Sequence, residues 1–542
     1  MVTVSTKYLI AGSITILILL CGMLAFPLGH DQSIFQLGGN MIFKQGAIPY
    51  RDFLELKQPL IFYIYGFTNW MFGDHEWSVR LFDIFYHCIT LYFFYRLLRK
   101  VYQDERIALF SIVLYTLYYT GSGYWMTSQT ESFALLPTLL ITEAILKFEQ
   151  GSNSFGKILE FALIIGIAIF ILISLKITLG LVIIAFIPII LFHSNQTFPF
   201  KIRFVCFTII FTIGFLFLAC LGLYLTGAWD NFTTSLIWIN KYADIVPILS
   251  IETFKNVYFH AFPSLLVSSI SLTYFVLSII GITIHNTKYE TSLKSKFLPK
   301  FFHVILFWQL AIGLFGVLFE RKNFVYQYTR VVWILMPFIS LAILFLYQHC
   351  KRYYRQEKNK NNIRRIYSVG LVAVILVIVL LFSPLPRVIS QPVEWTWLTI
   401  RHDDNAKEAK LAEDEYSGLE IENMAKKIIP KQLAQNQLFF WGNYVHIYLS
   451  TGTLPPTLCL ANPQFISPWT PKEWKQQMII DLKNASPRFF ITEYNDSRPF
   501  ITGTTSDSYA SLLQWDELRT YLFMNYQLLD SSRHFKIYSR IE

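Results

Sequence analysis

Residues 8–28 read YLIAGSITILILLCGMLAFPL and contain no charged side chain. A run of about 20 apolar residues is long enough to cross the hydrocarbon core of a bilayer as one helix. The run follows Lys7 and has no small-residue cleavage site of the kind that ends a secretory signal, so it predicts a membrane span that is retained. His30 and Asp31 follow almost directly. The first predicted helix therefore ends beside an acidic side chain.

The composition of the whole chain agrees with this first segment. Of its 542 residues, 54% are hydrophobic and 15% are charged, against about 25% charged residues in a soluble domain. The 49 Phe, 31 Tyr and 13 Trp exclude a disordered chain. The formal charge of +10 comes mainly from Lys and Arg in short loops between apolar runs, which favours membrane lipids rather than nucleic acid as the partner. Six scattered Cys form no disulfide framework and no metal-binding CxxC pair.

Similar apolar runs recur along the chain and predict about eleven transmembrane helices. One of them, from Ile158 to Phe192, is too long for one helix, and we expect a tight turn at Lys176 to divide it. The predicted spans cover residues 8–28, 79–98, 106–122, 132–149, 158–175, 177–192, 203–226, 262–284, 302–319, 328–347 and 366–386.

The distribution of Lys and Arg predicts the orientation of these spans. Basic residues concentrate in one set of alternate loops, most densely at 351–365, and cytoplasmic loops carry that excess. The N-terminus is therefore expected in the cytoplasm, and an odd number of spans places the tail outside the cytoplasmic membrane. We expect a transmembrane domain over 1–386 and an extracytoplasmic domain over 387–542.

The tail has the pattern of a small α/β domain. Strand-like segments occur at 437–442 (QLFFWG), 488–494 (RFFITEY) and 535–540 (FKIYSR), separated by helical segments. Helices are expected at 444–452, 472–486 and 509–523, after a polar helix or linker at 403–415. The predicted fold class is a polytopic α-helical membrane protein with a C-terminal α/β domain.

The first outer loop, 29–78, holds the leading candidates for chemistry. Asp31 at the membrane surface is suited to act as a general base toward a hydroxyl or amine, although a solvated acid that ends a helix explains it as well. Asp52 and Glu55 are three apart and would share one face of a helical turn. Two such carboxylates can orient an acceptor or bind a divalent cation, whereas a solvated surface with Arg51 as partner is the simpler account.

Lys57 lies just before Pro59, where we expect a short interfacial helix to begin and run to about Gly73. A cation beside a helix N-terminus favours a phosphate, because the free backbone N–H groups and the helix dipole act in the same direction. The alternative is a lysine that reaches toward lipid head groups.

Three further sets of ionisable residues occur at or inside the spans. Glu131 begins the fourth span from its outer end, as a cavity residue or a helix cap. Asp83 and His87 are four apart on the second span and are expected to hydrogen-bond to each other. Basic and aromatic residues gather at the outer end of the ninth and tenth spans, which suits an anionic ligand or interfacial anchoring. They are Arg321, Lys322, Tyr326, Gln327, Tyr328 and Arg330.

Taken together, the sequence resembles the GT-C glycosyltransferases. The resemblance rests on an acid after the first span, then GAIPYRDFLELKQPLIFYIYG (46–66), WSVRLFDIFYHCITLYFFYRLLRK (77–100) and TESFALLPTLLITEAIL (130–146). It is closest to the bacterial branch related to protein O-mannosyltransferases, glycosyltransferase family 39, and to the aminoarabinose transferases that modify lipid A. The tail segment WGNYVHIYLSTGTLPPT (441–457) is similar to that of uncharacterised members.

The resemblance implies transfer of a sugar, a hexose or a pentose, from a polyprenyl-phosphate donor to a lipid, glycan or protein acceptor outside the membrane. It implies that Asp31 is the base that activates the acceptor, that Lys57 lies beside the donor phosphate and that Arg330 assists Lys57 there. Glu131 and Asp52 follow as further site residues, with Glu55 and Tyr328 as substrate contacts.

The chain departs from the family pattern at two positions. Gln32 stands where many relatives have a second acid, which argues against a metal at that point, and Gln58 stands where many have a proline. The acids of the first loop fit either the presence or the absence of a divalent cation. The main alternative function is a transporter or flippase of a lipid-linked anion, which normally has polar residues reaching both membrane faces and repeated halves. A catalytically inactive scaffold is a third.

Overall fold

The computed structural model describes residues 3–151, 154–245, 297–322, 324–356, 385–413, 418–429, 433 and 435–541. The chain forms two compact units, each made of three segments. The first, called the helical unit below, comprises Met1–Phe26, Arg80–Phe215 and Leu249–Trp397. The second, called the mixed unit, comprises Pro27–Val79, Leu216–Ile248 and Leu398–Glu542.

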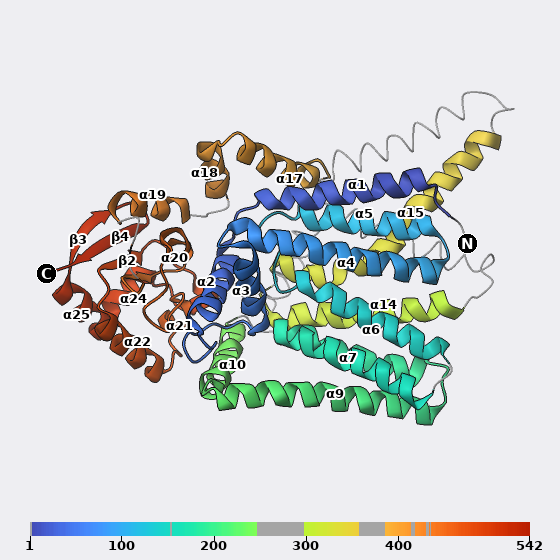
Figure 1. The fold of residues 1–542 in the computed structure, drawn as a ribbon, viewed down its shortest axis with the longest axis horizontal. Coiled ribbons are helices and arrows are strands. Elements are labelled where there is room, and N and C mark those ends of the chain that lie inside the picture. The colour runs from blue at the N-terminus through green and yellow to red at the C-terminus, as the bar shows by residue number, and fades with distance from the viewer. Residues whose placement is uncertain are drawn as a thin grey trace. The chain divides into compact units, whose positions relative to one another are not determined.

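The helical unit is built from long apolar helices that run side by side (Figure 1). Apolar residues on all faces suit helices that lie in a bilayer or deep in a bundle. The helices assigned wholly or mainly to it are α1 (Thr6–Cys21), α4 (Glu76–Tyr102), α5 (Glu105–Gly121), α6 (Leu135–Gln150), α7 (Phe155–Leu175), α8 (Val182–Pro188), α9 (Phe198–Leu225), α14 (Phe297–Glu320), α15 (Thr329–Gln356) and α17 (Leu385–Ile400).

Six helices in the described part of the chain are long and apolar enough to cross a membrane. They cover Thr6–Ala25, Glu76–Tyr102, Phe155–Leu175, Phe198–Leu225, Pro299–Glu320 and Val325–Phe345. The expected spans at 106–122 and 132–149 are helical as α5 and α6 but have only 17 and 16 residues. The expected span at 262–284, and that at 366–386 except for its last two residues, lie outside the described residues. A total of about eleven spans therefore stays a prediction.

The segment predicted as a span at 177–192 is not one continuous α-helix. Lys176 has an extended backbone (φ −165°, ψ 126°) that ends α7, which confirms the expected break at that residue. A 3₁₀ turn at Ile177–Leu181, the short helix α8 and a π turn at Ile189–His193 follow. Pro188 stands at the end of α8, where its ring prevents a regular α-helix from continuing.

The helical unit packs through apolar contacts with a few internal hydrogen bonds. α5 packs against both α1 and α15, and α6 packs against α7. Ser111 on α5 lies 3.0 Å from Ser340 on α15, and Gln309 on α14 donates to Thr142 on α6 at 3.0 Å. These bonds satisfy polar groups that would otherwise be costly between apolar helices.

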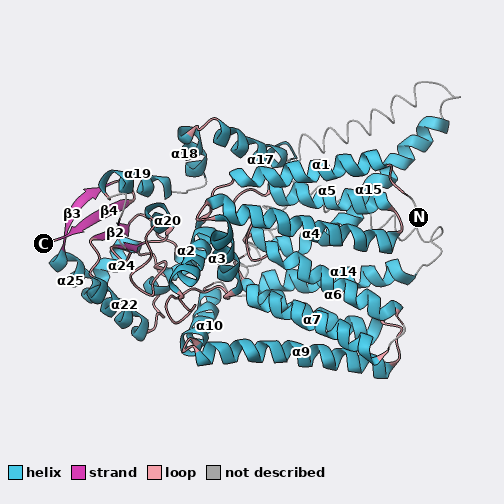
Figure 2. Ribbon diagram, viewed as in Figure 1, coloured by secondary structure: helices cyan, strands magenta, loops and turns pink. Residues whose placement is uncertain are grey.

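The mixed unit contains a four-stranded sheet, and Figure 2 shows strands in this unit among helices and loops. The strands are β1 (Leu438–Trp441), β2 (Phe489–Glu493), β3 (Tyr526–Ser531) and β4 (Phe535–Arg540), in the order β1-β2-β4-β3. β1 and β2 are parallel and the other pairs are antiparallel. The three expected strands are confirmed. β3 was not predicted because only Tyr526 of its six side chains is buried, which leaves no alternating pattern.

The mixed unit also contains helices, two of which belong to the first loop. The helices of the mixed unit are α2 (His30–Gln45), α3 (Leu60–Phe72), α10 (Trp229–Asp244), α18 (Asp404–Glu413), α19 (Gly418–Ile428), α20 (His446–Thr451), α21 (Pro463–Ile466), α22 (Lys472–Ala485), α23 (Pro499–Thr502), α24 (Ser508–Gln514) and α25 (Asp516–Asn525). The short helix expected from Pro59 to Gly73 is present as α3, and the helices expected at 444–452 and 472–486 are present as α20 and α22. The single helix expected at 509–523 is instead two helices, α24 and α25, because Trp515 between them has a non-helical backbone (φ −96°, ψ 97°). The placement of α3 in the membrane interface stays a prediction.

The first loop and the tail share one hydrophobic core. The backbone N–H of Leu54 donates to the carbonyl of Leu458 at 2.8 Å, and the Leu54 side chain belongs to the same buried cluster as Trp441 on β1. Trp474 on α22 donates its indole N–H to Asn231 on α10 at 2.9 Å. The structure thus groups residues 27–79 with the tail, while the expected domains 1–386 and 387–542 stay a prediction.

Helices α2 and α3 approach each other at two glycines. A Cβ atom on Gly39 would lie 2.4 Å from the backbone nitrogen of Gly66 and 2.8 Å from the carbonyl oxygen of Phe62. Neither neighbour is a flexible side-chain end, so the two helices would have to separate. Since α2 begins beside Asp31 and α3 follows Lys57, this contact also fixes where the two candidate residues lie.

We predict that Gly39→Ala destabilises the protein by about 1–3 kcal/mol, the usual cost of overpacking. Gly156→Ala on α7 is the matched control, because a Cβ atom there meets nothing within 4 Å. The thermal unfolding midpoints of both purified variants measure the effect. Equal midpoints for the two variants would contradict the close approach of α2 and α3.

Candidate functional site

The structure brings Asp31 and Lys57 together. Asp31 lies in the first turn of α2, where an acid is favoured by the helix dipole, and Lys57 lies three residues before α3. The Lys57 Nζ is 3.5 Å from the Asp31 Oδ2, and the two side chains are 21% and 27% exposed. The hydroxyl of Tyr50 donates to the Lys57 carbonyl at 2.7 Å, which fixes the backbone. A base and a cation therefore lie side by side and in reach of a ligand.

Asp52 and Glu55 do not face each other, although Glu55 interacts electrostatically with both Asp31 and Lys57. Asp52 accepts two hydrogen bonds from Arg51 and one from the Ile48 N–H at 2.7 Å, and the Arg51 bond lowers the pKa of Asp52. Glu55 is buried and accepts from Gln464 at 3.1 Å, and burial raises its pKa. The segment forms a turn and isolated bridges rather than a helix, so spacing by three does not give a shared face.

The acids of the first loop do not converge on a metal site. Within the residues that the structure describes, no group of three or more His, Cys, Asp or Glu side chains is arranged to hold a metal ion. The arrangement of Asp31, Asp52 and Glu55 does not fit a divalent cation held by all three.

A polar network that the sequence did not single out connects His30, the neighbour of Asp31, to the tail. Hydrogen bonding sets the Asn443 amide with its Nδ2 at 2.7 Å from the His30 Nε2 and its Oδ1 accepting from Arg498. Arg498 also donates to the Tyr444 hydroxyl at 3.1 Å. Burial, together with the charge of the nearby Arg498, lowers the pKa of His30 to about 4. His30 is therefore neutral at physiological pH.

Glu493 on β2 also belongs to this network. Its carboxyl is buried and accepts from the Asn443 backbone N–H at 2.7 Å. Burial, together with the charge of Asp496, raises the pKa of Glu493 to about 8. The carboxyl is therefore protonated over most of the physiological range.

A second cluster joins the start of α2 and α4 to the tail. The Nε2 of His446 lies 2.9 Å from Glu422 and 3.3 Å from Glu76, while its Nδ1 lies 3.3 Å from the Ser33 hydroxyl. Burial lowers the pKa of His446, but the bond to Glu422 and the charge of Glu76 outweigh it and raise the pKa overall. The first loop thus contacts the tail near its start, through His30 and Ser33, and near its end, through Glu76.

In the helical unit, Glu131 and Arg330 form a buried ion cluster with Lys176 and Glu320. Lys176 lies 2.7 Å from Glu131 and 2.5 Å from Glu320, and Arg330 lies 2.9 Å from Glu131 and 2.6 Å from Glu320. The Glu131 side chain is fully buried. Burial raises the pKa of Glu131, but Lys176 and Arg330 outweigh it and hold the pKa below its usual range. Two acids and two bases balance within the cluster.

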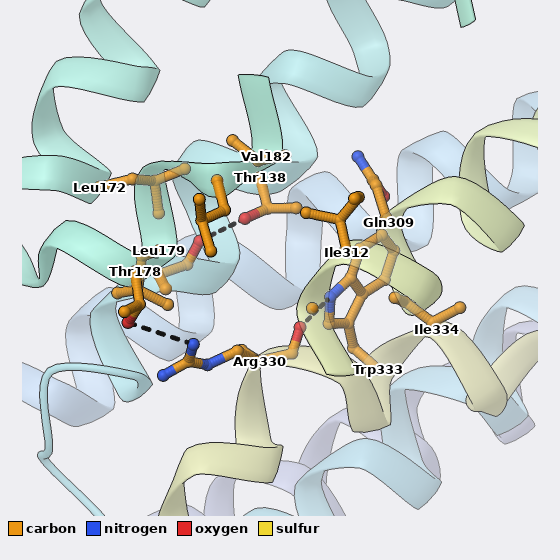
Figure 3. A pocket seen from close by; sticks show the side chains of 13 residues that line it. Thr138, Leu172, Thr178, Leu179, Val182, Gln309, Ile312, Arg330, Trp333 and Ile334 are labelled. Carbon is orange, nitrogen blue, oxygen red and sulfur yellow. Dashed lines mark hydrogen bonds between the residues drawn. The ribbon is translucent and has the colours of Figure 1, made fainter. Parts of the chain in front are cut away.

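A narrow, mostly apolar pocket adjoins this cluster. Figure 3 shows the Arg330 guanidinium pointing toward Thr178, whose hydroxyl is 3.4 Å away, and the Trp333 indole N–H donating to the Arg330 carbonyl at 3.1 Å. Thr138, Gln309 and apolar side chains complete the lining. Tyr328 is buried one turn before, at the end of the 3₁₀ turn Val325–Tyr328. Arg330, one of the residues singled out from the sequence, therefore borders a cavity.

Asp83 and His87 hydrogen-bond to each other inside the helical unit, as the sequence predicted. The His87 Nδ1 is 2.8 Å from the Asp83 Oδ1, and Asp83 also accepts from Tyr119 at 2.5 Å and Ser128 at 2.8 Å. These contacts explain both ionisable side chains as parts of one internal network.

Sequence reasoning missed Glu320, Asn443, Arg498 and His446, whose partners are between about 10 and more than 400 residues away along the chain. Glu320 ends an apolar span and Asn443 lies in a turn, so neither carries a local signal. Lys176 did carry one, because a lone charge within an apolar run is a candidate for a buried interaction.

Comparisons with known proteins agree with this architecture. Residues 57–225 match the family model of dolichyl-phosphate-mannose-protein mannosyltransferases. The solved structure of ArnT from Cupriavidus metallidurans, bound to undecaprenyl phosphate, aligns with a TM-score of 0.56 at 12% identity over 99% of both chains. Archaeal oligosaccharyltransferase AglB from Archaeoglobus fulgidus aligns with a TM-score of 0.48 at 11% identity over 99% of this chain and 74% of its own. No curated protein matches the sequence.

The chain has helices that are long and apolar enough to cross a membrane, and its fold is similar to that of ArnT. Over residues 57–225 the chain is also similar to the mannosyltransferase family, which is a GT-C family. The resemblance predicted from the sequence is confirmed at this level.

The buried ion cluster gives a prediction for stability. Glu131→Gln leaves two cations facing one acid, and removal of one partner from a buried pair costs about 3–5 kcal/mol. The double change Glu131→Gln with Lys176→Met restores the charge balance, so its thermal unfolding midpoint should lie above that of Glu131→Gln. A double variant less stable by the sum of the two single losses would contradict the coupling.

The raised pKa of Glu493 gives a prediction for pH dependence. The folded protein holds the proton up to about pH 8, whereas an unfolded Glu loses it near 4.3. Stability from this group therefore falls as the pH rises between those values. Glu493→Gln cannot ionise and should flatten the dependence, with the largest gain in unfolding midpoint at about pH 8.

Exposed Glu473→Gln on α22 is the control and should leave the pH dependence unchanged. A Glu493→Gln profile parallel to that of the wild type would contradict a proton on Glu493.

Proposed function

We propose that this protein is an integral membrane glycosyltransferase. It takes a sugar from a polyprenyl-phosphate donor and transfers it to a lipid, glycan or protein acceptor on the outer face of the cytoplasmic membrane. The observation that carries the proposal is the half-buried Asp31–Lys57 pair at 3.5 Å, in a chain whose fold is similar to that of ArnT. The hexosyl or pentosyl specificity follows from the donor, which the experiment below identifies.

The pair provides the two charges that the reaction needs. Asp31 accepts the proton of an acceptor hydroxyl or amine while the acceptor atom forms a bond to the anomeric carbon. The bond from that carbon to the phosphate oxygen breaks, and the leaving group is polyprenyl phosphate. Lys57 stabilises the negative charge that develops on this phosphate. The products are the glycosylated acceptor and the free lipid phosphate.

The short distance between the two groups supports an ordered cycle. Without a ligand, each group neutralises the other and remains half-buried. A donor phosphate competes with Asp31 for Lys57, because the two unesterified oxygens of the phosphodiester carry a negative charge and accept charge-assisted bonds from the ammonium group. Donor binding then frees Asp31 to act as the base.

The other candidates occupy supporting positions in the proposal. Glu55 and Asp52 shape the loop around Lys57 through Gln464 and the Ile48 N–H. Arg330, with Glu131 and Tyr328 nearby, borders the pocket of the helical unit and would contact the lipid-linked substrate. Because Glu131 and Glu320 already balance the charge of Arg330, its contribution is smaller than that of Lys57.

Asp31→Asn is expected to reduce transfer by at least about 100-fold, the lower range for loss of a general base. Asn keeps the size and the N-terminal position of the side chain, so expression should remain at the wild-type level. The measurement is the level of each polyprenyl-phosphate sugar in cells with matched expression. One donor should accumulate in the variant and thereby identify the sugar.

Asp74→Asn is the matched control, because Asp74 is an exposed acid of the same loop that pairs with Lys44. Unchanged donor levels in Asp31→Asn, with the wild type active in the envelope, would favour the transporter or scaffold alternative.

Lys57→Ala is expected to weaken binding of the lipid donor by about 10-fold or more, since a charge-assisted bond to phosphate is lost. Lys44→Ala is the control, because Lys44 is an exposed cation of the same loop that pairs with Asp74. Binding of polyprenyl phosphate to the purified full-length protein is measured directly. Equal affinities for the wild type and Lys57→Ala would remove Lys57 from the donor site.

A further inference from the structure

The tail contains a second cavity, lined only by residues of the mixed unit. It has a volume of about 450 Å³, within the range of about 300–1,000 Å³ that is usual for ligand pockets. Its lining combines aromatic rings with polar side chains at the junction of α24 and α25 and on α22. None of these residues belongs to the network around Asp31.

Aromatic rings form the base of this cavity. The rings of Trp441 and Trp515 meet edge to face at 5.9 Å, and Phe465 packs against Trp441 at 6.5 Å. The Trp441 indole N–H is fixed by the Ser508 carbonyl at 2.8 Å, and the Trp515 indole N–H is fixed by Glu517 at 2.8 Å. Trp515 is only half-buried, so it is held in place and still reachable by a ligand.

Polar side chains surround the rings. Lys475 on α22 lies over the Trp515 ring, with its Nζ 5.2 Å from the ring centre. Gln514 and Glu517 are exposed at the edge and offer an amide and a carboxylate. A flat aromatic surface bordered by an ammonium, an amide and a carboxylate matches a pyranose ring, whose C–H face stacks on an indole while its hydroxyls exchange hydrogen bonds.

The charges around the cavity favour an uncharged ligand over an anion. Lys475 faces Glu517, and Asp516 is paired with Arg519 at 2.7 Å. The positive and negative charges balance, so the site lacks the excess of cations that a phosphate needs. A neutral, hydroxyl-rich ligand fits this balance.

We propose that this cavity binds a saccharide, and that the saccharide is part of the acceptor. The second part rests on the proposed function, because it assigns a sugar-bearing molecule to the acceptor side of the transfer. The cavity then selects acceptors that already carry a sugar, while Asp31 and Lys57 perform the transfer.

Binding is tested without any transfer reaction, using the full-length protein in nanodiscs. The probes are methyl α-mannoside, methyl β-glucoside, N-acetylglucosamine and chitobiose, followed by tryptophan fluorescence and saturation-transfer NMR. At least one should bind with a dissociation constant on the order of 1 mM. Gln514→Ala should weaken that binding several-fold, and Trp515→Ala should weaken it by about 10-fold through loss of ring stacking.

Two controls keep the result interpretable. Gln477→Ala changes an exposed glutamine of α22 that bonds to Asp481 and lies outside the cavity lining, and it should bind like the wild type. Trp515→Phe retains a ring and should bind better than Trp515→Ala, even if both lower the unfolding midpoint. Equal binding by Gln514→Ala and Gln477→Ala would overturn the site.

The outcomes separate this inference from the proposed function. Absence of binding to every saccharide, or binding of a Ser/Thr-rich peptide at the same residues instead, overturns the saccharide site. Saccharide binding that Trp515→Ala abolishes, in a protein whose Asp31→Asn variant leaves all donor levels unchanged, supports the site and contradicts the transferase. Wild-type transfer to sugar-free acceptors that Trp515→Ala leaves unaffected overturns the acceptor role.

Discussion

The mixed unit depends on the backbone bond between Leu54 and Leu458, 2.8 Å long, and on the core that surrounds it. This bond connects two segments that are about 400 residues apart, and Leu54 places its side chain among the tail aromatics. A loop that carries its own charged residues cannot be ordered by local contacts alone, because fixing each residue costs about 1–2 kcal/mol of conformational entropy. The tail supplies the buried area that offsets this cost, and Asp31 and Lys57 are held 3.5 Å apart as a result.

The two units accommodate buried ionisable side chains in different ways. In the helical unit, Glu131, Glu320, Lys176 and Arg330 compensate one another at 2.5 to 2.9 Å, so that this cluster carries no net charge. In the mixed unit, burial holds His30 neutral and Glu493 protonated, and their hydrogen bonds reach Asn443. A neutral His30 beside Asp31 adds no charge of its own to the Asp31–Lys57 pair, which suits a site where charge develops during a reaction.

Much of the local structure was predictable because it follows from side-chain patterns of short range. The helix after Pro59, the break at Lys176 and three of the four strands were recognised from apolar runs, proline and β-branched or aromatic residues. β3 was not predicted because five of its six side chains are exposed, which leaves no alternating pattern. The pair of Asp52 and Glu55 shows the limit of spacing, since a shared face needs a helix and the segment forms none.

By itself, the sequence determined the helical character of the chain, the α/β pattern of the tail and the choice of Asp31 and Lys57 as chemical candidates. Hydrophobicity, helix starts and strand patterns depend on neighbouring residues, and such signals can be read along the chain. Tertiary structure alone decided that the first loop shares a core with the tail, that Glu131 faces Lys176, and that His30 meets Asn443. These contacts join residues that are 45 to more than 400 positions apart, and the free energy of such contacts depends on burial and charge balance that exist only after folding.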